Sequence, residues 1–400
     1  MEEIKKGGPL QGLKVLDLTR VLSGPFATKW LAAMGADVTK IENPGDPDVT
    51  RNYMPQKNGH SAYFPTVNHN KKCITLNLKA EEGKDLFRRM VKDTDVVIEN
   101  FRPGVMDKLG LGYGELSRIN PGLIYASISG YGTYGPYSQR PGYDVTAQAF
   151  SGIMYLTGEA GGPPSRIGSS YGDTTAGVNA VLAILAALYC RNQTGQGQMV
   201  ETSLVESLIS LSTQDYIRYF AAGEVPVRMG NIYKSWTPYG CYQAKDGWYN
   251  IGVGRPKQWK AFARVIGHPE LEEDPRFADH PVRICHREEL DAYINEWAAD
   301  KTVKEICERL VDAGVPCAPV NSIVELSQDE HFAGAREMFP TMQQDGIGEL
   351  QITNIPVRFS KSGLAPLKSA GEPGQDNESV FGSLGLSPEE IRDLKDRGII

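Results

Sequence analysis

Two carboxylates lie in a glycine- and proline-rich stretch near the middle of the chain, YLTGEAGGPPSRIGSSYGD, residues 155–173. They are Glu159 and Asp173. The stretch contains too many glycine and proline residues to form a helix or a central strand. Asp173 stands directly before the apolar run TTAGVNAVLAILAALY, where an aspartate can also act as a helix cap. The residues alone therefore leave two interpretations open, a connector with a capping aspartate and a catalytic loop.

Basic, polar and aromatic side chains follow several apolar runs that read as strands. In a doubly wound sheet, ligands bind beyond the carboxyl ends of the strands, where helix N-termini favour anions. The residues in such places are Arg20 to Ser23 after the first run, Lys79 after the third, and Asn100, Phe101, Arg102 and Lys108 after the fourth. Such cations could meet a phosphate and the aromatic ring could stack on a base. The ordinary alternative is a connecting turn with solvated charges.

The elements that must position these residues alternate between strand and helix along the N-terminal half. Strands are predicted at residues 13–18, 37–42, 73–78, 95–100 and 123–129, and helices at 23–34 and 80–93. The pattern predicts an α/β fold with an open, mostly parallel sheet covered by helices. G-x-G-x-x-G is absent after the first strand, which disfavours a nicotinamide dehydrogenase.

The pattern changes near residue 220. Residues 240–254 alternate like a hairpin around Asp246-Gly247, and helical segments follow at 256–267 and 287–314. These features predict a smaller α+β domain at 221–315, between a large domain at 1–220 and a C-terminal segment at 316–400 that returns to it. Ser387 and Glu390 are spaced as a helix-capping pair in that segment.

Composition restricts the class of protein. The 400 residues carry a formal charge of −7, which argues against a general nucleic-acid binder. The N-terminus lacks the apolar core of a signal peptide, and the 13-residue run Val178 to Cys190 is too short to span a bilayer, so we expect a buried helix and a cytoplasmic protein without a membrane partner. Six scattered cysteines without a CxxC pair predict neither a disulfide framework nor a metal site.

A connector at residues 129–152 carries four tyrosines ahead of Val145, interleaved with glycines. Connectors of this length are functional or disordered, and the aromatic residues argue against disorder. We expect Tyr131, Tyr134 and Tyr137 to shape a substrate pocket, with packing between subunits as the alternative.

Seven blocks of sequence occur in the order found in one family. They are KVLDLTRVLSGPFATKWLAAMGADVTKIENPGD, NKKCITLNLK, ENFRPG, ISGYGTYGP, PGYDVTAQAFSGIMYLTGE, GPPSRIGSSYGD and TGQGQMVETSLVES. Together they resemble the class III coenzyme A transferases, the CaiB/BaiF family. The resemblance implies a Rossmann-like large domain, a small domain and an interlocked homodimer. It also implies transfer of coenzyme A from an acyl-CoA donor to a free carboxylic acid, with no metal or redox cofactor.

The resemblance assigns roles to residues of this sequence. It implies that Asp173 is the nucleophile, that Asp144 supports it, and that Gly252 and Gly254 belong to an oxyanion-stabilising loop. Glu159 is then an ordinary loop carboxylate. The implied contacts to coenzyme A are Val21, Leu22, Asn43, Leu76, Asn77, Lys79, Asn100, Phe101, Arg102, Val105, Lys108 and Arg140. Asn43 departs from relatives that carry a basic residue there.

Two other functions are alternatives for a protein that resembles this family. The similar acyl-CoA racemases use a histidine where this sequence has Tyr143, and tyrosine, with an ordinary pKa of about 10, is a poor proton relay at neutral pH. A catalytically silent coenzyme A-binding subunit, paired with an active paralogue, is the other alternative, and Asp173 argues against it. The sequence identifies neither the acid nor the donor, nor the direction of transfer.

Overall fold

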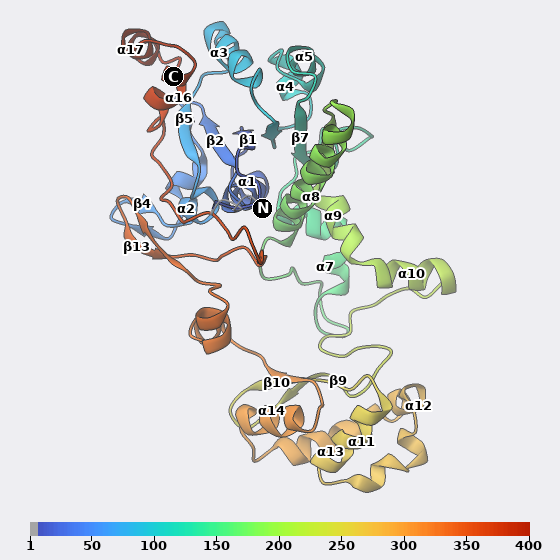
Figure 1. Ribbon diagram of the computed structural model, residues 1–400. Coiled ribbons are helices and arrows are strands. Elements are labelled where there is room, and N and C mark those ends of the chain that lie inside the picture. Colours follow the sequence, from blue (N-terminus) through green and yellow to red (C-terminus); the bar gives the residue numbers. More distant parts are fainter. Residues whose placement is uncertain (1–6) are drawn as a thin grey trace. The chain divides into compact units, whose positions relative to one another are not determined.

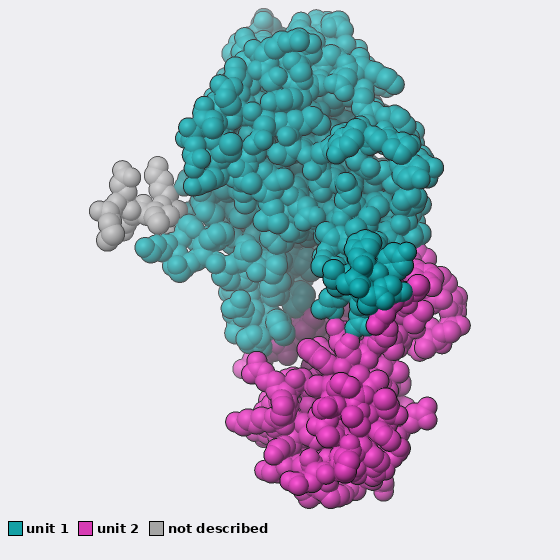
Figure 2. All heavy atoms as spheres, turned by 90° about the vertical axis from the view of Figure 1, so that its right-hand side faces the viewer, with its two compact units in different colours: residues 1–153, 166–223, 331–400 teal, residues 154–165, 224–330 magenta. Residues whose placement is uncertain are grey.

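The computed structural model describes residues 7–400, which divide into two compact units. Unit 1 comprises residues up to 153, 166–223 and 331–400, and unit 2 comprises residues 154–165 and 224–330 (Figure 2). Residues 331–400 thus belong to the same unit as the N-terminal half of the chain. The sequence predicts this return at residue 316. The structure places it after Glu330, because residues 317–319 form a strand of the unit 2 sheet.

Unit 1 is built on a six-stranded parallel sheet (Figure 1). Its strands in chain order are β1 (Lys14–Asp17), β2 (Asp37–Glu42), β5 (Lys72–Thr75), β6 (Val96–Glu99), β7 (Ile124–Ser129) and β8 (Met199–Ser203). They lie side by side as β5-β2-β1-β6-β7-β8. This order is that of a Rossmann-type sheet, in which the chain changes direction of travel between the first and fourth strands. The parallel α/β sheet predicted from the sequence is confirmed.

Helices and short strands surround this sheet. The helices of unit 1 are α1 (Ser23–Ala33), α2 (Tyr63–Asn68), α3 (Glu81–Val91), α4 (Val105–Lys108), α5 (Tyr113–Ile119), α6 (Asp144–Phe150), α8 (Tyr171–Thr194), α9 (Leu204–Leu211), α10 (Thr213–Ala222), α16 (Asn377–Ser383) and α17 (Pro388–Asp396). Two hairpins, β3 (Gln56–Lys57) with β4 (His60–Ser61) and β12 (Thr341–Gln344) with β13 (Gly348–Gln351), complete the unit. The short helix α7 (Ile153–Leu156) stands where the chain passes from unit 1 to unit 2.

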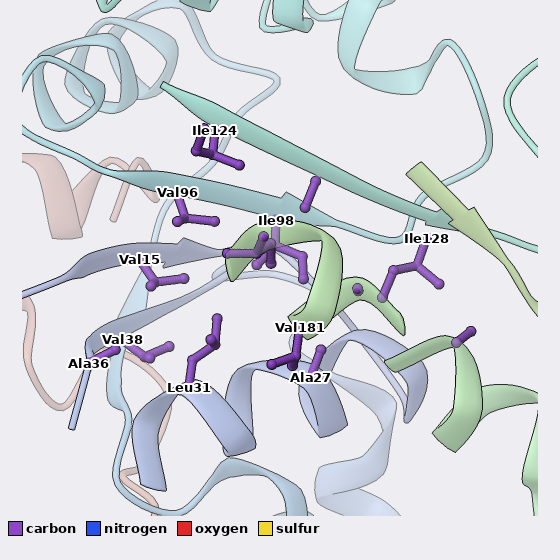
Figure 3. Packing of buried hydrophobic residues seen from close by; sticks show 14 of the residues in the cluster. Val15, Ala27, Leu31, Ala36, Val38, Val96, Ile98, Ile124, Ile128 and Val181 are labelled. Carbon is purple, nitrogen blue, oxygen red and sulfur yellow. The ribbon is translucent and has the colours of Figure 1, made fainter. Parts of the chain in front are cut away.

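Alternate residues of the strands point to two separate cores. Val15 of β1 belongs to the core beneath α1 and α8, whereas Leu16 belongs to the core that α3 and α17 cover. Figure 3 shows the first core, where Ala27 and Leu31 of α1 and Val181 of α8 lie against strand residues such as Val15 and Ile98. The two faces of the sheet are therefore buried by helices from both ends of the chain.

Helix α8 departs from its sequence-based expectation. It covers 24 residues rather than the 13 of the apolar run, and only one side is buried, since Leu182 and Tyr189 are 61% and 68% exposed. By length and composition alone it meets the criteria for a membrane-spanning helix, as the core helices of globular proteins also do. Its buried side packs against α1 and α9.

Unit 2 combines a three-stranded antiparallel sheet with helices. Strands β9 (Tyr239–Gln243) and β10 (Trp248–Gly252) form the hairpin predicted around Asp246-Gly247, and β11 (Cys317–Pro319) pairs with β10. Its helices are α11 (Pro256–Val265), α12 (His280–Cys285), α13 (Arg287–Ala298), α14 (Val303–Asp312) and α15 (Ile323–Ser327). The helical segment predicted at 287–314 is divided at Thr302, which caps α14 with Glu305.

Candidate active site

The site begins where β1 and β6 end side by side. The turn that follows β1 is tied to Asn100, the first residue after β6. Asn100 Oδ1 accepts a hydrogen bond of 2.8 Å from the Arg20 N–H, and its Nδ2 donates to the Arg20 carbonyl at 2.8 Å. This is the position in the sheet where ligands bind in open α/β folds. The order of the strands thus brings together two segments that are far apart in the sequence.

Two cavities share walls at this edge of the sheet. The larger, of about 590 Å³, is lined by six of the predicted coenzyme A contacts: Asn43, Leu76, Asn77, Lys79, Phe101 and Val105. The smaller, of about 240 Å³, is lined by Asp173 together with Val21, Leu22, Asn100, Phe101, Arg102 and Arg140. Arg20 and Phe101 line both cavities. Lys108 lines neither cavity and is exposed, so its assigned role stays a prediction.

The charges around the larger cavity are arranged in pairs. Glu42 pairs with Arg51 at 2.6 Å, Asp46 with Arg20 at 3.0 Å, and Asp48 with Lys40 at 3.0 Å. Neutralised carboxylates leave the ammonium group of Lys79 as an attractive charge for a phosphate. The smaller cavity adds Arg102 and Arg140 around a single acid, Asp173. A local cationic site therefore exists within an acidic protein.

Asp48 also fixes an unusual backbone conformation in the turn after β1. Val21 has φ = 69°, in the left-handed region that β-branched residues rarely adopt. The N–H of Val21 points to Asp48, at 3.2 and 3.3 Å from its two carboxylate oxygens. Lys40 and Asp48 have no exposed side-chain surface, so the pair holding this turn is buried. Strained backbone of this kind is concentrated at functional sites.

Asp173 lies in the first turn of α8, beside the smaller cavity. Burial raises the pKa of its carboxyl to about 7, the charge of Asp144 contributes to this rise, and a hydrogen bond from Ser23 opposes it. A helix N-terminus favours the ionised form of a carboxyl, whereas burial and a neighbouring carboxylate favour the neutral form, and the pKa of Asp173 is raised. A pKa close to the working pH is typical of catalytic groups.

Asp173 is not the residue that caps α8. The N-cap position belongs to Ser170, whose side chain makes no capping hydrogen bond. Instead Asp144 Oδ1 accepts hydrogen bonds from the backbone N–H groups of Gly172 at 2.7 Å and Asp173 at 3.3 Å. Its other oxygen accepts a bond from Gln148. The capping interpretation of Asp173 therefore falls, because a residue from α6 performs that task.

The tyrosine-rich connector forms an aromatic cluster. Tyr131 and Tyr137 each lie 5.3 Å from the ring of Phe150, measured between ring centroids. The guanidinium of Arg140 stacks on Tyr137 at 3.9 Å, which orients this cation in the wall of the smaller cavity. Tyr134 is 79% exposed. The connector thus supports Arg140 through Tyr137, and its role in shaping an acyl pocket stays a prediction.

The remaining predicted residues belong to unit 2. The N–H of Gly252 donates to the Pro316 carbonyl at 3.0 Å, and that of Gly254 to Gln258 Oε1 at 3.1 Å. In this arrangement neither amide is available to an oxyanion, and the role that the resemblance assigns to them stays a prediction. Glu159 also lies in unit 2.

The sequence pattern did not indicate that two residues, Ser23 and Tyr63, lie near Asp173. Ser23 lines the smaller cavity together with Asp173, and hydrogen bonding from it lowers the pKa of the Asp173 carboxyl. Burial, together with the charge of Asp173, raises the pKa of Tyr63 in α2 to about 12. Ser23 lies far from Asp173 in the sequence, and its only signal was its place at the helix start after the first strand. Tyr63 had no signal in the strand and helix pattern.

Comparison with known proteins identifies the family. A model described as CoA-transferase family III matches residues 10–377. The chain belongs to CoA-transferase family III. The acetyl-CoA:oxalate CoA-transferase of Acetobacter aceti is 42% identical, over 89% of this chain and 90% of that protein. The succinyl-CoA–D-citramalate CoA-transferase of Chloroflexus aurantiacus is 35% identical, over 98% of both proteins.

Solved structures give the same result for this CoA-transferase. A CAIB/BAIF family protein from Brucella suis is 36% identical, with a TM-score of 0.83 over 94% of this chain and all of that one. The family resemblance of the sequence blocks is therefore confirmed, and with it the class of enzyme. Neither racemase nor nicotinamide dehydrogenase activity is supported.

Proposed function

We propose that this CoA-transferase moves coenzyme A from an acyl-CoA to a free carboxylic acid through a covalent intermediate on Asp173. The observation that carries the assignment is the position of Asp173. Its carboxyl shares a cavity with Arg102, Arg140 and Asn100, and has a pKa near neutrality. Covalent catalysis by a carboxylate divides one difficult transfer into easier steps.

The steps follow from the chemistry of a carboxylate and a thioester. The Asp173 carboxylate attacks the thioester carbonyl and expels the coenzyme A thiolate, which leaves a mixed anhydride on the enzyme. The thiolate then attacks the acyl carbon of Asp173, releases the donor acid and forms an aspartyl-CoA thioester. The acceptor carboxylate reverses these two steps with its own acyl group. No oxidation or reduction occurs.

The raised pKa suits this cycle. A desolvated carboxylate with a pKa of about 7 is more basic than an exposed aspartate, and a substantial fraction is still ionised at neutral pH. Asp144 acts as a positioning residue, because its Oδ1 accepts hydrogen bonds from the backbone N–H groups of Gly172 and Asp173. The nucleophile is thus held by the start of a 24-residue helix.

The acceptor belongs to the small carboxylic acids, with dicarboxylates as our first candidates. The smaller cavity is lined by Arg102 and Arg140, and by Arg20, which is paired with Asp46, against the one acid Asp173. Oxalate and D-citramalate appear in the names of two relatives, and both are small and doubly charged. A second carboxylate can form a bidentate pair with an arginine.

We further propose an interlocked homodimer as the working form. Helix α10 has no buried residue, although Ile217, Tyr219 and Phe220 are 55%, 54% and 72% exposed. Such an apolar surface is typical of an interface. Light scattering of the purified protein should give twice the chain mass of 43.9 kDa, and a monomer would favour the heteromeric alternative.

Trapping tests the central proposal. The purified protein is incubated with acetyl-, formyl- or succinyl-CoA, quenched with hydroxylamine or borohydride, and the modified residue is mapped by mass spectrometry. A label on Asp173 that is absent from Asp173→Asn is expected. Coenzyme A binding without any label would instead support the silent-subunit alternative, and a label on Glu159 or Asp144 would move the site.

A further inference from the structure

Ser23 is a buried hydroxyl that helix capping does not explain. It is the first residue of α1, the N-cap is Leu22, and no side-chain capping bond exists there. Its exposed fraction is 5%. Buried hydroxyl groups are normally used by a partner, so the partners of Ser23 indicate its role.

Asn100 fixes the orientation of that hydroxyl. The backbone of Arg20 supplies both a donor and an acceptor to the Asn100 amide, at 2.8 Å each, which determines which end is oxygen and which is nitrogen. The Nδ2 group also donates to Ser23 Oγ at 3.2 Å. Because Ser23 accepts this bond, its own proton is free to point elsewhere. Ser23 and Asp173 line the same small cavity, and hydrogen bonding from the Ser23 side chain lowers the pKa of the Asp173 carboxyl.

A glycine brings the two helices close enough for that bond. Gly177 lies one helical turn after Asp173, on the same face of α8. A Cβ atom on Gly177 would lie 2.7 Å from the Ser23 carbonyl oxygen and 3.1 Å from the Phe26 ring, so only glycine fits. One turn further on, Val181 and Ala27 continue the contact between α8 and α1 (Figure 3). Close packing at Gly177 therefore places Asp173 beside Ser23.

We propose that Ser23 is a catalytic residue whose hydroxyl holds one oxygen of Asp173 and stabilises the negative charge that develops on it. The inference rests on the proposed function of Asp173 as the nucleophile. It assigns an oxyanion donor within unit 1. The donors implied by the family resemblance, the N–H groups of Gly252 and Gly254 in unit 2, are already bonded to other acceptors. Asn100 acts on this donor as a positioning residue.

The step is the attack of the coenzyme A thiolate on the mixed anhydride. A carbon–sulfur bond forms at the acyl carbon of Asp173, and the carbonyl electron pair moves onto the oxygen that Ser23 holds. The pair then returns, the bond to the donor's carboxylate oxygen breaks, and that carboxylate leaves with its electrons. Ser23 keeps its proton throughout. Hydrogen bonds to a charged oxygen are stronger than those to a neutral one, so the bond stabilises the tetrahedral state selectively.

The test compares Ser23→Ala and Ser23→Cys with the control Ser207→Ala. Cysteine fills the position with a side chain of the same shape, slightly larger than serine, but is a weak donor, which separates loss of packing from loss of hydrogen bonding. Ser207 is also buried and accepts a bond from an asparagine, Asn179, at 3.0 Å, but it does not contact Asp173. The readouts are single-turnover formation of the aspartyl thioester, affinity for free coenzyme A and the pH dependence of the rate.

We expect both Ser23 variants to form the thioester roughly 100-fold more slowly, in line with the loss of one oxyanion donor. Affinity for coenzyme A should be unchanged. The acidic limb of the pH profile should move to higher pH, because the hydrogen bond that both variants lack lowers the pKa of Asp173. The control should stay within about twofold of the wild type, as expected for a site outside the chemistry.

Two results would overturn the inference, and they are distinguishable. If the wild type is labelled at Asp173 and either soluble Ser23 variant keeps the wild-type rate and pH profile, Ser23 has no catalytic role and the proposed function stands. If the wild type is labelled elsewhere or not at all, the proposed nucleophile is wrong and the role of Ser23 falls with it. Because Ser23→Cys leaves no cavity, it still decides the test if the alanine variant misfolds.

Discussion

Asp144 acts on Asp173 in two ways, through a backbone hydrogen bond and through its charge. One of its oxygens accepts a hydrogen bond from the Asp173 backbone N–H at 3.3 Å, which holds the first turn of α8 in place. Its charge meanwhile raises the pKa of the Asp173 side chain. The same carboxylate therefore positions the nucleophile and keeps it basic.

Replacing Asp144 with asparagine should separate these two effects. The amide oxygen can still accept the backbone hydrogen bonds, but the negative charge is gone, so the pKa of Asp173 should fall below about 7. The acidic limb of the rate profile should then move to lower pH, measured as single-turnover rate from pH 5 to 9. Asp144→Ala also loses the cap, which costs about 1 kcal/mol. An unshifted limb in Asp144→Asn would contradict the electrostatic part of this account.

Asp173→Asn should stabilise the folded protein while it abolishes transfer. The pKa of this carboxyl is raised from 3.8 to about 7 on folding, so the folded state keeps a proton that the unfolded chain has lost. The wild type therefore loses stability as the pH rises from about 4 through about 7, and an amide does not. Allowing for partial exposure of the carboxyl, we expect a gain of about 1–2 kcal/mol above pH 7.

Urea unfolding at pH 4.5, 6 and 8 measures that gain. The difference between variant and wild type should increase with pH and become constant above neutrality. A difference that is the same at all three values would mean that Asp173 titrates normally in the folded protein.

Gly177→Ala should damage both stability and activity. Its Cβ would meet a backbone oxygen at 2.7 Å, which cannot move aside as a flexible side chain can. Overpacking of this kind costs about 1–3 kcal/mol, and displacement of α8 should also slow thioester formation. Gly114→Ala is the matched control, because no atom lies within 4 Å of its added Cβ in α5. Thermal unfolding and the single-turnover rate should change in the first variant only.

Asp48→Ala should destabilise the protein by about 3–5 kcal/mol, because it removes the carboxylate that forms a buried ion pair with the Lys40 ammonium. It also removes the acceptor for the Val21 N–H, so affinity for coenzyme A should fall. Asp46→Ala removes a solvent-exposed pair with Arg20 and should change the free energy of unfolding very little, because water screens such pairs. Equal losses of unfolding free energy in the two variants would show that the buried pair stabilises the protein no more than the exposed pair.

Much of the fold was predictable because it depends on local pattern. Short apolar runs bounded by turn residues predicted β1, β2, β6 and β7, and Asp246-Gly247 predicted the hairpin of unit 2. Asp173 was identified by the order of motifs around it rather than by its own surroundings. The boundary at residue 316 was misplaced because the pairing of β11 with β10 joins segments that are distant in the sequence, and no local signal records that contact.

Motifs and hydrophobic pattern were enough to indicate the family, the parallel α/β sheet and the carboxylate on which the chemistry is proposed. The tertiary structure decided what surrounds that carboxylate. Its pKa is raised, because the carboxyl is buried and lies near the charge of Asp144. Its helix is capped by Asp144 from another helix, and its carboxyl shares a cavity with Ser23 from the first helix of the chain. Such contacts depend on how closely α8 and α1 approach at Gly177, which is a property of packing in three dimensions and not of any local pattern.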